Sequence, residues 1–93
     1  MKGRLIPGIN VAFTVDTDGD VYKNGNLIKP FSAQGYERVT VKDLNGGYKC
    51  YGVHQLVAMA FLDHVPNGHT LVVDHINDVK SDNRLSNLQL ITQ

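Results

Sequence analysis

The chain has 93 residues and a mass of 10.3 kDa, the size of one small domain and too small for a large cofactor-binding core. Hydrophobic residues make up 42% and charged residues 19%, which is typical of folded rather than disordered chains. Lys plus Arg equals Asp plus Glu at nine each, which argues against a partner held by bulk charge alone. The single cysteine excludes an intramolecular disulfide and the paired-cysteine clusters of structural zinc sites.

The sequence also bears on location and on the distribution of charge. No window approaches the roughly 18 consecutive apolar residues of a membrane helix, and the start of the chain is too short for a secretory signal. We therefore expect a soluble, intracellular (cytoplasmic) protein with no membrane partner. Residues 1–49 carry seven Lys/Arg against five Asp/Glu, and residues 50–93 carry two against four. A weakly basic first half suits phosphate contacts, and an acidic second half suits ligands for a divalent cation.

The first half of the sequence predicts antiparallel strands. Short runs that alternate in the strand period are separated by glycine-containing turn signals, a pattern typical of hairpins. The turn signals are Asp18-Gly19, Asn24-Gly25 and Asn45-Gly46-Gly47. The strands expected around them are residues 11–15, 21–23, 27–28, 36–44 and 48–53, with Pro30 ending the first meander.

In the second half the period becomes helical from His54, and the helix should end near Asp63 before a Pro-Asn-Gly loop. Residues 71–73 are an apolar run of buried-strand type, which leads directly into Asp74 and His75. The remaining expected elements are a polar loop at 77–82, a helical turn at 83–87 and a strand at 88–92. The pattern predicts an α+β domain with a small antiparallel N-terminal sheet, one central helix and a C-terminal ββ hairpin.

Asp74 and His75 are the first candidates for chemistry. Neighbours on a strand point to opposite sides, so one side chain can bind a metal while the other faces substrate. Mg²⁺ prefers oxygen ligands and keeps several waters, so one carboxylate and a substrate phosphate suffice, and a neutral histidine is suited to take a proton from water. On these two residues alone, a strand-end pair without chemistry is the better interpretation.

The longer segment from Val73 to Thr92 reverses that balance. It strongly resembles the HNH endonuclease family of phage and intron origin, whose members read like VDHINGDKxDNRLxNLxxVT. Residues 53–61, VHQLVAMAF, resemble the VHRLVAxAF helix of these proteins, and residues 18–22 resemble their SNxGRVYS element. The resemblance covers most of the chain.

The resemblance implies a metal-dependent DNA endonuclease that hydrolyses phosphodiester bonds. His75 matches the family's general base, Asp74 a metal ligand for Mg²⁺ or Mn²⁺, and Asn87 the central asparagine that ties the loop back. His54 matches a helix residue without an agreed catalytic role, and we interpret it as structural. The implied organisation is one compact unit in which residues 1–52 form a β region that contacts DNA and residues 53–93 form the helix plus the HNH-like motif.

Two departures from the family stand out. Asp78-Val79 replaces the Gly-Asp that often follows the His-Ile-Asn of the family, so the loop geometry is expected to differ. The family's motif also continues into a helix that supplies a last His or Asn ligand, whereas this sequence ends at Gln93. A truncated chain, a degenerate copy that binds DNA or regulates without cleaving, and a protein completed by another chain all fit this departure. A protein-interaction domain is a more distant alternative.

The candidate DNA-binding residues are Arg38, Lys42, Lys49 and Arg84. The first two share one face of the hairpin expected at 36–53, and the tyrosines nearby are Tyr36, Tyr48 and Tyr51. A β-ribbon of this composition suits the major groove of DNA, and it suits an ordinary half-exposed sheet equally well.

Two other metal sites are disfavoured. A zinc site from Cys50, His54, His64 and His69 has plausible local spacing only between the first two. A calcium loop at Asp16, Asp18 and Asp20 lacks the bidentate Glu at the required offset, so a solvated hairpin tip is the better interpretation.

Overall fold

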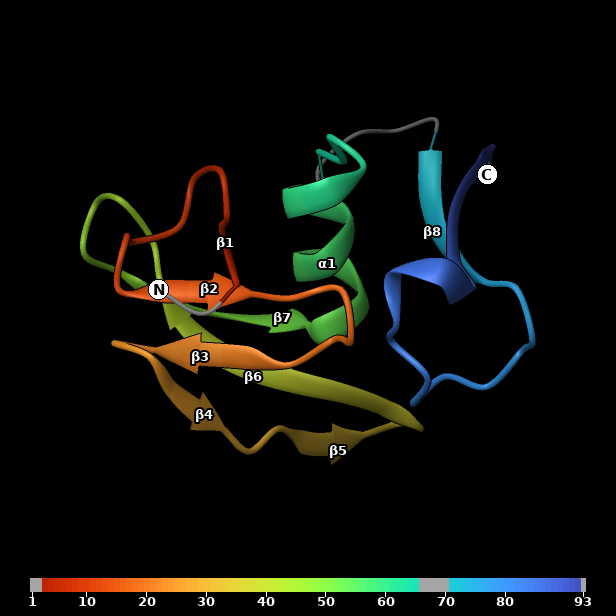
Figure 1. The fold of residues 1–93 in the computed structure, drawn as a ribbon, viewed down its shortest axis with the longest axis horizontal. Coiled ribbons are helices and arrows are strands. Elements are labelled where there is room, and N and C mark those ends of the chain that lie inside the picture. The colour runs from red at the N-terminus through yellow and green to blue at the C-terminus, as the bar shows by residue number, and fades with distance from the viewer. Residues whose placement is uncertain (1–2, 66–70, 93) are drawn as a thin grey trace.

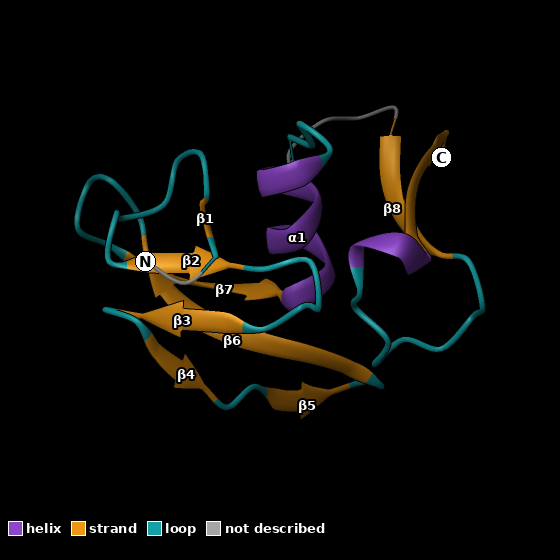
Figure 2. Cartoon of the chain, in the orientation of Figure 1, coloured by secondary structure: helices purple, strands orange, loops and turns teal. Residues whose placement is uncertain are grey.

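The structure is a computed structural model, and it describes residues 3–65 and 71–92. The elements in chain order, drawn in Figures 1 and 2, are β1 (Arg4–Leu5), β2 (Phe13–Val15), β3 (Val21–Lys23), β4 (Asn26–Ile28), β5 (Phe31–Ala33), β6 (Tyr36–Lys42), β7 (Tyr48–Gly52), α1 (Val53–Phe61), β8 (Leu71–His75), the 3-10 turn η1 (Leu85–Asn87) and β9 (Leu88–Thr92). No helix in the described ranges is long and apolar enough to cross a membrane.

Within the described ranges the strands form three antiparallel sheets, in the orders β1-β2-β3-β4, β5-β6-β7 and β8-β9. The expected α+β fold with a central helix and a C-terminal ββ hairpin is confirmed. The N-terminal strands divide between two of these sheets, because the chain after Pro30 leaves the first sheet and pairs Phe31 with Arg38 in the second. An isolated bridge between Ile9 and Asp43 joins the two N-terminal sheets.

Several boundaries differ from those expected. The first meander strand begins at Phe13 rather than at Val11, because the amide of Ala12 bonds the side chain of Asn10 in a turn. Strands β1 and β5 were not expected, since runs of two and three residues carry no readable period. Leu71, expected in a buried strand, is 41% exposed, whereas Val73 and His75 on the same face of β8 are half-buried and buried.

Helix α1 is the element that both halves of the chain share, and it lies between the N-terminal sheets and the β8-β9 hairpin in Figure 1. It begins after Gly52, whose amide donates to Oε1 of Gln55 at 3.0 Å. Its fully buried side chains include Leu56 and Val57. The core that they join is drawn from β2, β3, β6 and β9, and includes Val15, Val21, Val39, Val41 and Leu88.

This packing predicts that Leu56→Ala lowers the free energy of unfolding by about 2–5 kcal/mol, because the change removes buried methyl groups and leaves a cavity. The matched control is Leu44→Ala, at a side chain that is 67% exposed, which should cost less than about 0.5 kcal/mol. Urea unfolding of both variants measures the difference. Equal losses in the two variants would contradict the placement of α1 at the centre of the core.

Candidate functional site

The candidate site lies at the end of β8, where the strand leads into the loop of residues 76–84. His75 is only 6% exposed, while Asp74 is half-buried. Oδ2 of Asp74 accepts a hydrogen bond from Nε2 of Gln89, its cross-strand partner on β9, at 2.8 Å. The two neighbouring side chains therefore sit in different environments, as strand geometry requires.

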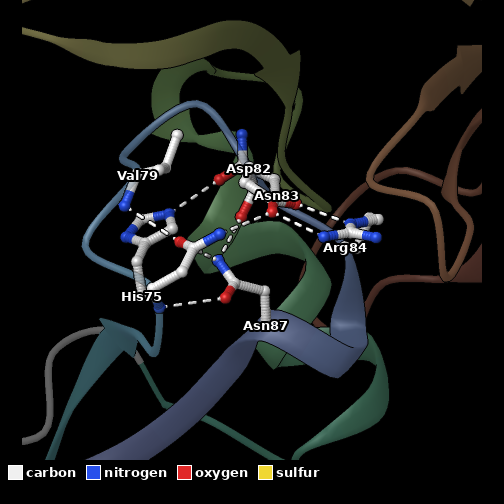
Figure 3. A network of polar contacts seen from close by, with 7 residues as sticks. His75, Val79, Asp82, Asn83, Arg84 and Asn87 are labelled. Atoms are coloured by element: carbon white, nitrogen blue, oxygen red, sulfur yellow. Dashed lines mark hydrogen bonds and ion pairs between the residues drawn. The ribbon is translucent and has the colours of Figure 1, made fainter.

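Asn87 closes the loop (Figure 3). Its Nδ2 donates to Oδ1 of Asn77 and to the carbonyl oxygen of Asp82, each at 2.9 Å, and its Oδ1 accepts from the amide of Asn77 at 3.1 Å. The carbonyl oxygen of Asn87 also accepts from the amide of Ile76 at 2.8 Å. One side-chain amide thus bonds both ends of the loop, which needs a donor and an acceptor on the same planar group.

Asn83 holds the ring of His75. Its Oδ1 lies 2.9 Å from Nε2 of His75, and both side chains are buried, at 5% and 6% exposed. Because an amide oxygen only accepts, the hydrogen bond places the ring proton on Nε2 and leaves Nδ1 as the nitrogen that can take up a proton. The contact between Asn83 and His75 was not predicted from the sequence, since an eight-residue separation in a loop follows no period.

Two more rings pack around His75. The centroid of His54, from α1, lies 5.0 Å from that of His75, and the centroid of Tyr36, from β6, lies 5.2 Å from that of His54 and 6.1 Å from that of His75. Nζ of Lys80, in the loop, sits 4.7 Å from the centroid of Tyr36. His54, interpreted from the sequence as structural, therefore contacts the candidate base directly.

Burial lowers the pKa of His54 to about 4, with smaller contributions from His75, Arg38 and His64. Its Nδ1 is buried and has no hydrogen-bond partner within residues 3–65 and 71–92. The ring lies against Gly52, where an added Cβ would sit 2.7 Å from Nδ1. A neutral His54 therefore packs against His75 near neutral pH.

The loop carries its own ion pair and one unusual backbone position. Asp82 accepts from Nε and Nη2 of Arg84 at 2.8 and 2.7 Å, and these bonds hold the pKa of Asp82 well below its usual range. Asp78 has φ +62°, a left-handed conformation that favours glycine and that Asp tolerates better than most residues. The glycine that the resembled family often has here is thus replaced by a residue that can adopt the same region.

The candidate DNA-binding residues do not form one cluster. Arg38 is half-buried and donates from Nε to Sγ of Cys50 and from Nη2 to the carbonyl oxygen of Cys50, both at 3.3 Å. Arg38 and Lys49 line the same hollow, of about 450 Å³, beside Tyr51. Lys42 lies outside this hollow with its Nζ 5.8 Å from the ring centroid of Tyr48. Arg84 belongs to the loop and pairs with Asp82.

Within the described ranges no three His, Cys, Asp or Glu side chains gather as a metal site. The disfavoured zinc set has Cys50 bonded by Arg38, His64 buried and His69 outside the described residues. In the disfavoured calcium loop, Oδ1 of Asp16 accepts the amides of Asp18 and Asp20.

The lowered pKa of His54 has a consequence for stability. A histidine with a pKa of about 4 in the folded state and about 6.5 when unfolded takes up its proton first in the unfolded chain. Stability from this group is therefore complete above the unfolded pKa and is lost as pH falls from about 6.5 towards 4. His54→Phe should flatten the pH dependence of the unfolding free energy in that window, while Tyr36→Phe should leave it unchanged. Identical pH dependence in His54→Phe and the wild type would contradict a buried neutral His54.

Comparison with known proteins agrees with this geometry. Residues 51–93 match the family model of the HNH endonuclease. The chain is 35% identical over 97 residues, all of this chain, to DNA endonuclease I-HmuI of Bacillus phage SP01, of which it covers 53%. It is 32% identical over 80 residues, 82% of this chain, to the SPbeta prophage-derived putative HNH homing endonuclease YosQ of Bacillus subtilis (strain 168), of which it covers 45%.

A solved structure is similar over the whole chain. The structure titled "DNA binding and cleavage by the HNH homing endonuclease I-HmuI" superposes with a TM-score of 0.81 at 33% identity, and the match covers 100% of this chain and 53% of that one. The chain thus spans about half the length of the relatives that it matches. Sequence and fold agree, and the chain belongs to the HNH endonuclease family.

Proposed function

We propose that the chain cleaves DNA by hydrolysing a phosphodiester bond, with His75 as the general base. The observation that carries this proposal is the buried hydrogen bond from Nε2 of His75 to Oδ1 of Asn83, which leaves Nδ1 of His75 as the nitrogen able to accept a proton. The relatives named as a DNA endonuclease and as a putative homing endonuclease support DNA as the substrate. In this proposal residues 1–52 supply the DNA-contacting surface and residues 53–93 supply the nuclease motif.

The proton transfer follows from the tautomer. Nδ1 of His75 takes a proton from a water molecule as the water oxygen attacks phosphorus. The bond from phosphorus to the 3′ oxygen breaks, and the 3′ oxygen leaves with the bonding electron pair and takes a proton from solvent water. The imidazolium that forms keeps its Nε2–H bond to Asn83, so the ring does not need to turn during the step. A positioned base of this kind contributes about 10²–10⁴ in rate.

Asp74 is the residue that would hold a divalent metal, Mg²⁺ or Mn²⁺. Its carboxylate is half-buried, and the amide of Gln89 occupies Oδ2 and fixes the orientation of the group. One carboxylate fits Mg²⁺, which keeps several waters and uses substrate phosphate oxygens as further ligands. When bound, such an ion neutralises charge on the phosphate and on the leaving oxygen.

DNA binding without cleavage is the second candidate function. The observation that favours it is the small donor set, since within residues 3–65 and 71–92 no three metal-ligating side chains gather around Asp74. Cleavage of a supercoiled plasmid separates the two candidates, because binding alone leaves the strands intact.

His75→Ala should lower the rate of plasmid nicking by about 10²–10⁴, because the change removes the proton acceptor. DNA affinity in a gel shift should stay close to that of the wild type, since the general base contributes to rate rather than to ground-state binding. Nicking rates with Mg²⁺ and with Mn²⁺, read alongside unfolding curves that report the folded fraction, measure the effect. Nicking by folded His75→Ala at the wild-type rate would overturn the assignment.

Lys42→Ala and Lys49→Ala should each weaken DNA binding and reduce the magnitude of the slope of log K against log salt by roughly one, as lost phosphate contacts do. The lysines test this surface more cleanly than Arg38, whose guanidinium also bonds Cys50. Lys29→Ala, an equal loss of charge at an exposed position between β4 and β5, is the control. If both Lys42→Ala and Lys49→Ala give the same slope as the wild type, as the control should, DNA does not contact the β6-β7 hairpin.

A further inference from the structure

The turn between β2 and β3 touches the residue that holds the base. The carbonyl oxygen of Thr17 accepts from the amide of Leu85 at 2.8 Å. Gly19 has φ +86°, and a Cβ added there would lie 2.7 Å from the carbonyl oxygen of Asn83 and 3.0 Å from its Cβ. In Figure 1 this turn points from the first sheet towards the C-terminal motif. A turn far away in the sequence therefore packs against the catalytic loop with no room for a side chain.

Hydrogen bonds within the β2-β3 turn fix its conformation. Oδ1 of Asp16 accepts from the amides of Asp18 and Asp20 at 3.0 and 2.9 Å, and its Oδ2 accepts from the hydroxyl of Tyr22 at 2.8 Å. The amide of Gly19 also donates to the carbonyl oxygen of Asp16 at 3.1 Å. Such local bonds fix a turn without help from other elements. The surface presented to Asn83 is thus rigid.

We infer that the β2-β3 turn positions the general base: it holds Asn83 in place, and Asn83 in turn fixes which nitrogen of His75 carries the proton. This inference deepens the proposed function and rests on it for the role of His75. Gly19 and Asp16 are positioning residues in this scheme, because neither contacts the ring of His75.

The distances indicate how strongly a side chain at position 19 should disturb the hydrogen bond between Asn83 and His75. A real Cβ at position 19 would have to move from 2.7 Å to an ordinary contact with the carbonyl oxygen of Asn83, a shift of roughly 0.5 Å or more. A shift of that size is comparable to the whole range of good hydrogen-bond lengths, so it weakens or breaks the bond of 2.9 Å to His75. Asn87 holds the same loop at Asp82 and Asn77, which limits how far the loop can follow.

The test is the tautomer of His75 in the full chain, read from the nitrogen chemical shifts of ¹⁵N-labelled histidine in alkaline buffer. The wild type should show a protonated Nε2 and an unprotonated Nδ1. Gly19→Ala should show a mixture of the two tautomers, as should Asn83→Ala. The matched control is Gly25→Ala, because Gly25 has φ +83° but no atom within 4 Å of an added Cβ. It carries the same backbone cost without the contact and should keep the wild-type tautomer.

A second pair of variants covers the case in which Gly19→Ala does not fold. Asp16→Ala removes the side-chain hydrogen bonds that fix the β2-β3 turn. Asp43→Ala removes the equivalent bonds of the β6-β7 turn, where Oδ1 of Asp43 accepts from the amides of Asn45 and Gly47 at 2.9 and 3.0 Å. Only Asp16→Ala should mix the tautomers. A wild-type tautomer in folded Gly19→Ala or in folded Asp16→Ala would overturn the inference.

Nicking kinetics give the second readout. Gly19→Ala should lower kcat by roughly tenfold or more, part of the 10²–10⁴ that a general base contributes, with KM close to that of the wild type. Gly25→Ala should leave both unchanged. If the wild-type chain does not nick DNA at all, the proposed function fails while the tautomer measurement still decides whether the turn positions His75.

Discussion

The amide side chain of Asn87 is the constraint on which the site depends. Its donor and acceptor bond Asn77 at the start of the loop and Asp82 near its end, and all of these bonds are made by a side chain that is 6% exposed. A buried hydrogen bond contributes about 1 kcal/mol, and an unsatisfied buried partner costs about 1–3 kcal/mol. With the loop closed in this way, Asn83 reaches back to His75 and Asp82 pairs with Arg84.

Helix α1 connects this loop to the rest of the chain. Its buried side chains join the core of the N-terminal sheets, and Leu88 of β9 joins the same core. The helix also places His54 against His75, while β6 places Tyr36 against both rings. His75 is therefore packed against side chains from α1 and β6, which are both distant in sequence, and is hydrogen-bonded by Asn83 of the following loop. The N-terminal sheets and the β8-β9 hairpin thus both contribute to the packing around one site.

The sequence predicted those strands and the helix whose side-chain alternation or helical spacing is visible within a short stretch of residues. Strand β3, strand β9 and the start of the central helix lie within one residue of the expected ranges, because alternation and helical spacing are set by side chains close along the chain. The loop-tying role of Asn87 came from the family resemblance rather than from spacing, and the bonds of Asn87 fit that role. The division of the N-terminal strands into two sheets was not readable, since it depends on which distant strand accepts the chain after Pro30.

The parts of the site that were missed share one physical cause. The hydrogen bond of Asn83 to His75 and the close approach of Gly19 to Asn83 join residues that no helical or strand period links. A hydrogen bond that selects a tautomer depends on a position accurate to a few tenths of an ångström. A glycine at a close approach looks like any other turn glycine until the neighbouring backbone is known.

The most direct test of a loop that presents His75 as a base is a crystal structure of this chain with a DNA duplex and Ca²⁺, an ion chosen to slow cleavage. The scissile phosphate should lie within reach of Nδ1 of His75 through one water molecule, and Nε2 of His75 should still be bonded to Asn83. The carboxylate of Asp74, on the opposite side of the strand, should face the metal ion. A phosphate backbone that stays at the hollow beside Arg38 and Lys49 and never approaches His75, or a ring turned so that Nδ1 bonds Asn83, would contradict it.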